Sequence, residues 1–188
     1  MAVDLVISGG TVLDGSGAAG FPADVAVTGG VIAAIGSLAG ALADRRIDAS
    51  GQVVAPGLID IHTHSDVTLT RPAAGINKIC QGVTTEVTGN CGFSAFPVGP
   101  GLAAEHAEHL AYLGPDRADL RWQDFAGYAA AVEAARPIAN VGCLVGHGTQ
   151  RIAAGVPAAA SIRRRTPRRS AGCWRSAWTR ARSASPPG

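Results

Sequence analysis

The sequence lacks a hydrophobic run long enough to cross a membrane. No apolar stretch approaches the roughly 18 residues of a transmembrane helix, although hydrophobic residues make up 47% of the 188-residue chain. The first residues also lack the basic start and apolar stretch of a secretory signal, since Asp4 stands among them. The sequence therefore predicts a cytoplasmic protein without a membrane partner.

Paired cysteines are absent as well. The chain has 4 cysteines and no CxxC pair: Cys80, Cys91, Cys143 and Cys173. In a reducing cytoplasm such isolated cysteines are thiols or metal ligands, because disulfide bonds form mainly in oxidising compartments. We expect no disulfide bond.

Acidic residues stop at Glu133. Residues 1–133 carry all 14 acids against 6 basic residues, a net charge of −8, whereas residues 134–188 carry 10 arginines and no acid. An arginine-rich segment of this kind could be an arm that binds nucleic acid. It could also be a segment that did not evolve to fold with the rest, and we favour this interpretation because the segment shows no recognised nucleic-acid-binding motif.

Glycine and proline are plentiful, with 25 and 11 residues, and they divide the chain. Short strands at 3–8, 24–28 and 31–35 are separated by glycine turns, which predicts a small antiparallel β domain over residues 1–56. The breaker Pro56-Gly57 marks its end.

Strands alternate with helices after this boundary. We expect strands at 58–62, 83–88 and 138–145, and helices at 72–81, 102–113 and 122–135. Such alternation favours an α/β fold with a parallel sheet, in which chemical groups lie at the carboxyl ends of the strands.

Potential metal ligands follow each of these strands. His62 and His64 lie two residues apart on a strand, so their side chains point to the same face. Alone, this pair could be two exposed loop histidines. Cys91 follows the second strand and His147 the third, and this arrangement favours a shared metal site.

Imidazole and thiolate groups suit zinc. A zinc ion with an open coordination position lowers the pKa of a coordinated water to about 7 and polarises carbonyl groups. The chemistry that these residues indicate is hydrolysis of an unactivated carbonyl such as an amide.

Four segments together match the pattern of a known family. They are Asp4–Gly17, Val54–Asp66 with His-x-His, Gly82–Gly92 with Gly-Asn-Cys-Gly, and Val145–Thr149 with Gly-His-Gly. These segments resemble the D-aminoacylase family, the N-acyl-D-amino-acid deacylases of the amidohydrolase superfamily. The resemblance covers about residues 3–155. It implies part of a zinc-bearing (β/α)₈ barrel over residues 57–155, preceded by the small β domain, and small N-acyl amino acids as substrates.

Site residues carry over from this resemblance one by one. His62 and His64 match the family's first zinc ligands, and Cys91 matches its metal-binding cysteine. His147 either contacts substrate or supports a ligand, or it is a structural histidine at a tight turn. Asp66 either orients a ligand or is a plain exposed aspartate. We interpret Cys80, Cys143, His106 and His109 as packing or surface residues.

A cyclic amidohydrolase such as a hydantoinase or dihydroorotase is the alternative. Hydantoinases bridge two metal ions with a carboxylated lysine far downstream of the histidine pair. Lys78 is the only lysine of this chain and follows the pair closely. The alternative therefore lacks its central residue, unless a lysine lies beyond a damaged region.

The family pattern stops after Arg151. The resemblance places further zinc histidines and the general acid/base aspartate on later strands, and none has a counterpart here. A (β/α)₈ barrel needs about 250 residues, whereas residues 58–188 supply 131. We therefore expect a truncated, unclosed barrel with little or no catalysis and with strand edges that promote aggregation.

A shifted reading frame explains the arginine-rich tail, residues 156–188, which we otherwise expect to be disordered. Read one base earlier, the codons of Trp178 (TGG) and Thr179 (ACN) yield GAC, aspartate. With GC-rich codons, residues 178–188 become a glycine-rich strand like that of the family. We hypothesise a frameshift between about residues 152 and 172.

The gene's nucleotide sequence tests this hypothesis. We expect the shifted frame to continue beyond the tail into an open reading frame that encodes further histidines. A shifted frame that soon meets stop codons, or that encodes no homologous segment, would show that the hypothesis is wrong.

Overall fold

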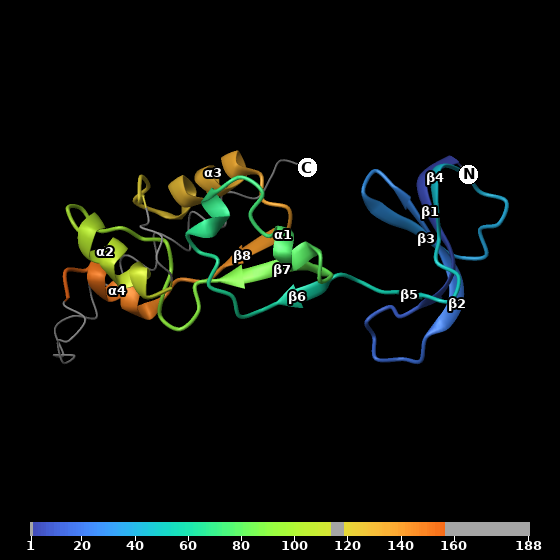
Figure 1. The fold of residues 1–188 in the computed structure, drawn as a ribbon, viewed down its shortest axis with the longest axis horizontal. Helices are drawn as coiled ribbons and strands as arrows, with labels where there is room; N and C mark the ends of the chain where they lie inside the picture. Colours follow the sequence, from blue (N-terminus) through green and yellow to red (C-terminus); the bar gives the residue numbers. More distant parts are fainter. Residues whose placement is uncertain (1, 114–118, 157–188) are drawn as a thin grey trace. The chain divides into compact units, whose positions relative to one another are not determined.

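The protein folds as two compact units. A computed structural model describes residues 2–113 and 119–156 (Figure 1). One unit comprises Met1–Gly57 and the other begins at Leu58. Each unit has its own sheet and its own core. The arginine-rich tail expected at 156–188 lies, from residue 157 on, outside the described residues.

The first unit is a five-stranded mixed sheet in the order β3-β2-β1-β4, with β5 beside β1. Its strands are β1 (Ala2–Val12), β2 (Phe21–Thr28), β3 (Val31–Gly36), β4 (Leu42–Asp48) and β5 (Val53–Val54). β1, β2 and β3 pair antiparallel, whereas β4 and β5 run parallel to β1. The expectation of an antiparallel domain is therefore correct for the first three strands and wrong for the last two.

Local sequence explains both outcomes in this unit. Gly29 and Gly30 have positive φ angles of 58° and 77°, as the tight turn of the β2–β3 hairpin requires. β4 reads Leu-Ala-Asp-Arg-Arg-Ile-Asp and is mostly exposed, so it carries little of the apolar alternation that marks a strand. The core is small and comprises Val3, Val6 and Ala26.

The second unit contains a three-stranded parallel sheet in the order β6-β7-β8. β7 (Val83–Thr88) has the bounds expected from its β-branched sequence. β6 (Leu58–Asp60) and β8 (Asn140–Cys143) are shorter than the strands expected at 58–62 and 138–145. The parallel α/β arrangement expected for this part of the chain is thus present.

Helices connect and follow these strands. They are η1 (Thr68–Thr70), α1 (Ile76–Ile79), α2 (Ala103–Leu110), η2 (Ala111–Leu113), α3 (Phe125–Ala135) and α4 (His147–Ala153). α1 is shorter than the helix expected at 72–81, because Ala73 and Gly75 adopt positive φ angles of 59° and 86°. α3 begins after Asp124, whose carboxylate accepts the Gly127 N–H. The sequence did not predict α4.

The core of the second unit is rich in aromatic residues. Trp122 and Tyr128 are buried with Leu69 and Phe96. The Trp122 indole donates a hydrogen bond to the Ala95 carbonyl over 2.7 Å, so its polar atom is satisfied. In Figure 1, α2 and α4 lie beyond the tip of the β7 arrow, and these two helices pack against each other. The carboxyl ends of the strands therefore face a helical layer.

β6 is an edge strand with exposed apolar side chains. Leu58, Ile59 and Ile61 are 61%, 63% and 72% exposed. A parallel strand is usually covered on both faces. The tendency of the chain to aggregate stays a prediction. Over the described ranges, no helix combines the length and hydropathy of a membrane span.

A buried hydroxyl ties α3 to the loop after β6. Tyr128, 1% exposed, donates a hydrogen bond to the Asp66 carbonyl over 2.7 Å. Tyr128→Phe should lower the free energy of unfolding by about 1–3 kcal/mol, because a buried carbonyl loses its donor. Thermal unfolding followed by circular dichroism measures the change. Tyr112→Phe is the control, since Tyr112 is 86% exposed, and an equal loss in both variants would contradict the prediction.

Candidate metal centre

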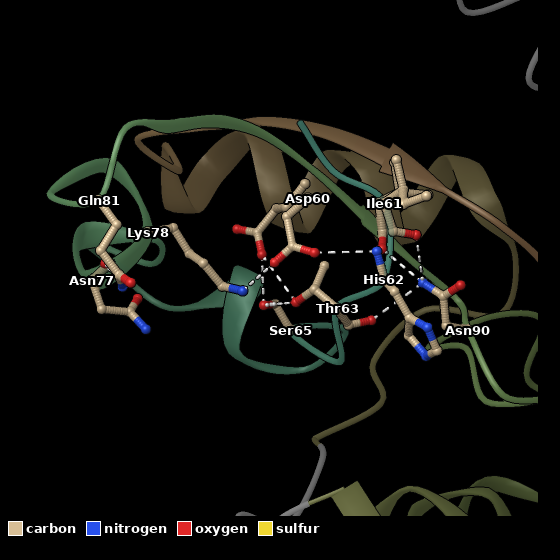
Figure 2. Close-up of polar contacts among 11 residues, drawn as sticks. Asp60, Ile61, His62, Thr63, Ser65, Asn77, Lys78, Gln81 and Asn90 are labelled. Atoms are coloured by element: carbon tan, nitrogen blue, oxygen red, sulfur yellow. Dashed lines mark hydrogen bonds and ion pairs between the residues drawn. The ribbon is translucent and has the colours of Figure 1, made fainter. Parts of the chain in front are cut away.

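The first candidate ligands follow the turn that ends β6. The Asp60 carboxylate accepts the His62 backbone N–H over 3.2 Å and forms an ion pair with Lys78 (Figure 2). The Lys78 hydrogen bond holds the pKa of Asp60 below its usual range. Pairing with β7 nevertheless resumes at Thr63, whose N–H donates to the Val87 carbonyl over 3.2 Å. This pairing holds the segment with both histidines beside β7.

Cys91 lies in a tight turn just after β7. The Phe93 N–H donates to the Asn90 carbonyl over 2.9 Å, and φ is +54° at Cys91 and +87° at Gly92. Two positive φ angles at the central positions define a type I′ turn. A non-glycine residue in this conformation is strained by about 1 kcal/mol or more, and such strain is common at functional sites.

His62, His64 and Cys91 come together at this end of the sheet. Their potential ligand atoms all lie within 4.8 Å of one another, and His62 Nε2 is 3.1 Å from Cys91 Sγ. A tetrahedral zinc ion with bonds of about 2.0–2.3 Å places its ligand atoms roughly 3.5 Å apart. Small side-chain rotations therefore suffice to close this group around zinc. All three residues are exposed, and Cys91 has a free thiol.

Two glycines let the Cys91 loop pack directly against the loop after β8. A Cβ atom at Gly89 would lie 2.2 Å from the Leu144 carbonyl oxygen, and one at Gly146 would lie 2.4 Å from the Gly92 carbonyl oxygen. Neither position has room for a side chain. The glycines of Gly-Asn-Cys-Gly and Gly-His-Gly thus permit backbone contact between the two loops.

Ser94 links the same two loops through hydrogen bonds. Its hydroxyl accepts the Gly146 N–H over 3.0 Å, and its own N–H donates to the Thr149 hydroxyl over 2.9 Å. The buried His106 ring donates to the Ser94 carbonyl over 2.8 Å, and burial lowers the pKa of His106. This network holds the start of α4 beside the Cys91 loop. The sequence did not predict the network.

His147 is the first residue of α4 and is exposed. It does not belong to the group formed by the three candidate ligands. The Ser94 network holds the start of this helix against the Cys91 loop, so His147 lies at a helix start.

Asp66 is buried rather than exposed. It is 1% exposed, and its carboxylate accepts the Gly89 N–H over 2.9 Å. Burial raises the pKa of this carboxyl to about 6. The alternative of a plain exposed aspartate is therefore wrong, and the hydrogen bond supports the backbone at the start of the Cys91 loop.

Glu86 supports the histidine segment through hydrogen bonds. The sequence did not predict this role. It is fully buried on β7 and accepts hydrogen bonds from Ser65 over 2.7 Å and from Thr63 over 3.3 Å. A buried carboxylate is costly unless it is hydrogen-bonded. The sequence signal was an acidic residue inside the β-branched run Val83–Thr88.

An aromatic row borders His64. The Phe93 ring lies edge to face with His64, at 6.2 Å between centroids and 89° between planes. It also stacks on His109 at 4.4 Å and 21°. These contacts restrict the orientation of the His64 ring.

Lys78 forms an ion pair with Asp60. Its ammonium group is therefore engaged by the carboxylate that also accepts the His62 N–H. This arrangement does not support the carboxylated lysine of a hydantoinase at this position.

The chain resembles known proteins over most of its length. A family model described as "Amidohydrolase family" matches residues 45–177. The chain is 47% identical over 152 residues to the D-aminoacylase of Alcaligenes xylosoxydans xylosoxydans, covering 80% of this chain and 30% of that protein. The chain thus spans about 30% of the length of the curated relatives that it matches.

Solved structures show the same likeness. The N-acyl-D-glutamate deacylase from Bordetella bronchiseptica, complexed with zinc and a phosphonate mimic of the tetrahedral intermediate, matches with a TM-score of 0.81. It is 39% identical, covering 94% of this chain and 36% of its own. A D-aminoacylase described with a binuclear metal centre matches with a TM-score of 0.72 at 46% identity, covering 81% of this chain and 31% of its own.

The buried carboxyl of Asp66 makes stability depend on pH. Its pKa of about 6 lies above that of the unfolded chain, so folding takes up a proton, and this stabilisation is lost as pH rises from about 4 to about 6. Asp66→Asn keeps an acceptor for the Gly89 N–H but does not titrate. The stability of this variant relative to the original chain should rise by up to about 3 kcal/mol between these pH values.

Urea unfolding at a series of pH values measures this difference. Parallel pH profiles for the two proteins would contradict the assignment of Asp66 as a buried, titrating carboxyl.

Proposed function

The chain belongs to the amidohydrolase family, and we propose that it supplies the first metal-binding strands of a zinc-dependent hydrolase of N-acyl-D-amino acids. The observation that carries this proposal is the convergence of His62, His64 and Cys91 at the carboxyl ends of two parallel strands. Three protein ligands with an open position are typical of catalytic zinc sites. The zinc and the phosphonate mimic in the Bordetella deacylase support both the metal and the reaction.

The proposed architecture follows from the parallel sheet. We propose that β6, β7 and β8 are the first three strands of a (β/α)₈ barrel, because ligands at the carboxyl ends of parallel strands are typical of barrel enzymes. Residues 1–56 would then be part of a separate β domain. A cytoplasmic location agrees with the free Cys91 thiol, which a reducing compartment preserves.

Each site residue has a proposed role in holding the zinc ion or in supporting the segments around it. His62, His64 and Cys91 would hold the zinc ion, which supplies Lewis acidity toward an amide carbonyl when bound. The Ser94 network and the glycine contacts hold the Cys91 loop against the start of α4. His147 stands at that helix start, from which we propose that it contacts substrate or supports a ligand. Asp66 acts through the backbone of Gly89.

A group for general acid/base catalysis is not evident among the described carboxylates near the ligands. The Asp60 carboxylate is paired with Lys78 and accepts the His62 N–H. The Asp66 and Glu86 carboxylates are buried, and each accepts local hydrogen bonds. The exposed ligands also lack the water-excluding surroundings that strengthen electrostatic catalysis. We therefore propose that these 188 residues bind zinc with little or no turnover.

Zinc binding tests the metal centre directly. Cys91→Ala should weaken zinc binding by at least about 10-fold, because it removes one of three ligands. Competition with a chromophoric chelator measures the affinity. Cys80→Ala is the matched control, since Cys80 is also an exposed free thiol but lies outside the ligand group. Equal affinities in the two variants would exclude Cys91 as a ligand.

Deacylase assays test the reaction. The zinc-loaded 188-residue chain should show no measurable release of D-amino acid from N-acyl-D-amino acids, and robust turnover would contradict this expectation. Protein made from the gene with its reading frame restored should hydrolyse these substrates. A restored protein that binds zinc but leaves them intact would exclude the proposed substrate class while retaining the metal centre.

A further inference from the structure

We propose that the side-chain amide of Asn90 is the positioning element that sets the distance between Cys91 and the histidine ligands. This inference rests on the proposed metal centre and assigns a role to the one residue of Gly-Asn-Cys-Gly not yet explained. Asn90 does not touch the metal position in this proposal, and it acts through the backbone of both ligand segments.

The Asn90 amide lies where backbone carbonyls from two segments converge. Its Nδ2 atom donates to the Val87 carbonyl over 2.8 Å. The same atom lies 3.4 Å from the Thr63 carbonyl oxygen and 3.5 Å from the Ile61 carbonyl oxygen (Figure 2). The first contact is a normal hydrogen bond, and the other two are long. The Asn90 side-chain amide is thus hydrogen-bonded to β7 and faces the histidine segment.

The residues in these contacts are direct sequence neighbours of the candidate ligands. Ile61 and Thr63 flank His62, and Thr63 also precedes His64. Asn90 itself precedes Cys91, and its own carbonyl accepts the hydrogen bond that closes the turn around Cys91. One residue therefore connects the backbone of all three candidate ligands.

The chemistry of this position requires a donor. A primary amide offers two N–H groups, and all three neighbouring atoms are carbonyl oxygens that only accept. A carboxylate of the same shape offers only acceptors, so it would repel these oxygens and separate the two segments. The strained, left-handed Cys91 would then lose a contact that holds its turn in place.

The chain offers a matched control at Asn140. Its Nδ2 also donates to a β7 carbonyl, that of Thr84, over 3.0 Å. Thr84 lies near the amino end of β7, whereas Cys91 lies beyond the carboxyl end of β7 and the histidine segment pairs at Val87, close to that end. Asn140→Asp therefore makes the same chemical change to the same kind of hydrogen bond, away from the ligands.

The experiment compares cobalt and zinc binding by the 188-residue chain and its variants Asn90→Asp and Asn140→Asp. Cobalt reports on the ligands, because a coordinated thiolate gives a thiolate-to-cobalt charge-transfer band that histidine ligands do not give. Asn90→Asp should lose most of this band and bind zinc about 10- to 100-fold more weakly. Asn140→Asp should keep both. Circular dichroism establishes that each metal-free variant is folded.

Three results would overturn the inference. Asn90→Asp with the original band and zinc affinity would show that the amide does not position Cys91. Equal losses in Asn90→Asp and Asn140→Asp would show a general effect on β7. An original chain without a thiolate band that depends on Cys91 would overturn the metal centre and this inference together.

A second variant covers the case in which Asn90→Asp does not fold. Asn90→Ser is neutral and keeps one donor, so it should fold and show an intermediate thiolate band and zinc affinity. A folded Asn90→Ser chain with an unchanged band and unchanged affinity would also overturn the inference.

Discussion

The parallel pairing of β6 with β7 is the constraint on which the candidate metal centre depends. β6 is only three residues long. Its regular strand pairing with β7 ends at Asp60, whose carboxylate accepts the His62 backbone N–H. The contact from Thr63 to Val87 then extends the pairing beyond the strand. Together with the contacts from Glu86 and Asn90, this extension positions the histidine segment relative to the turn that carries Cys91.

Polar groups rather than apolar packing hold the ligand segments. Glu86 supports the histidine segment through two hydroxyl groups, and Asp66 supports the Cys91 loop through one backbone N–H. Buried carboxylates stabilise a fold little, because their desolvation offsets much of the gain from hydrogen bonding. Their role here is to position the loops, since each carboxylate accepts a hydrogen bond from a segment next to a candidate ligand.

Features that depend on neighbouring residues were predictable from the sequence, whereas features that depend on partners far along the chain were not. β7 was predictable because its β-branched residues are consecutive, and the candidate ligands stand in short motifs next to strands. β4 was missed because its exposed, charged residues lack a strand's alternation. Ser94 acts through a partner 52 residues away, and no pattern near it predicts this contact. Asp66 was a candidate because it follows the histidine pair, but its burial and its contact with Gly89, 23 residues away, depend on the folded chain. The resemblance pointed to the three candidate ligands, and the folded chain shows which groups support the segments that carry them.

The candidate ligands are close together in sequence as well as in space. Cys91 follows His62 by 29 residues, and closing a loop of this length costs little entropy beyond that of a shorter one. The contacts to the loop after β8 span more than 50 residues and must form later. During synthesis on a ribosome, the chain therefore has all three candidate ligands, and the amide that aligns them, before β8 emerges. Metal capture at that stage would favour the pairing of β6 with β7 ahead of the rest of the sheet.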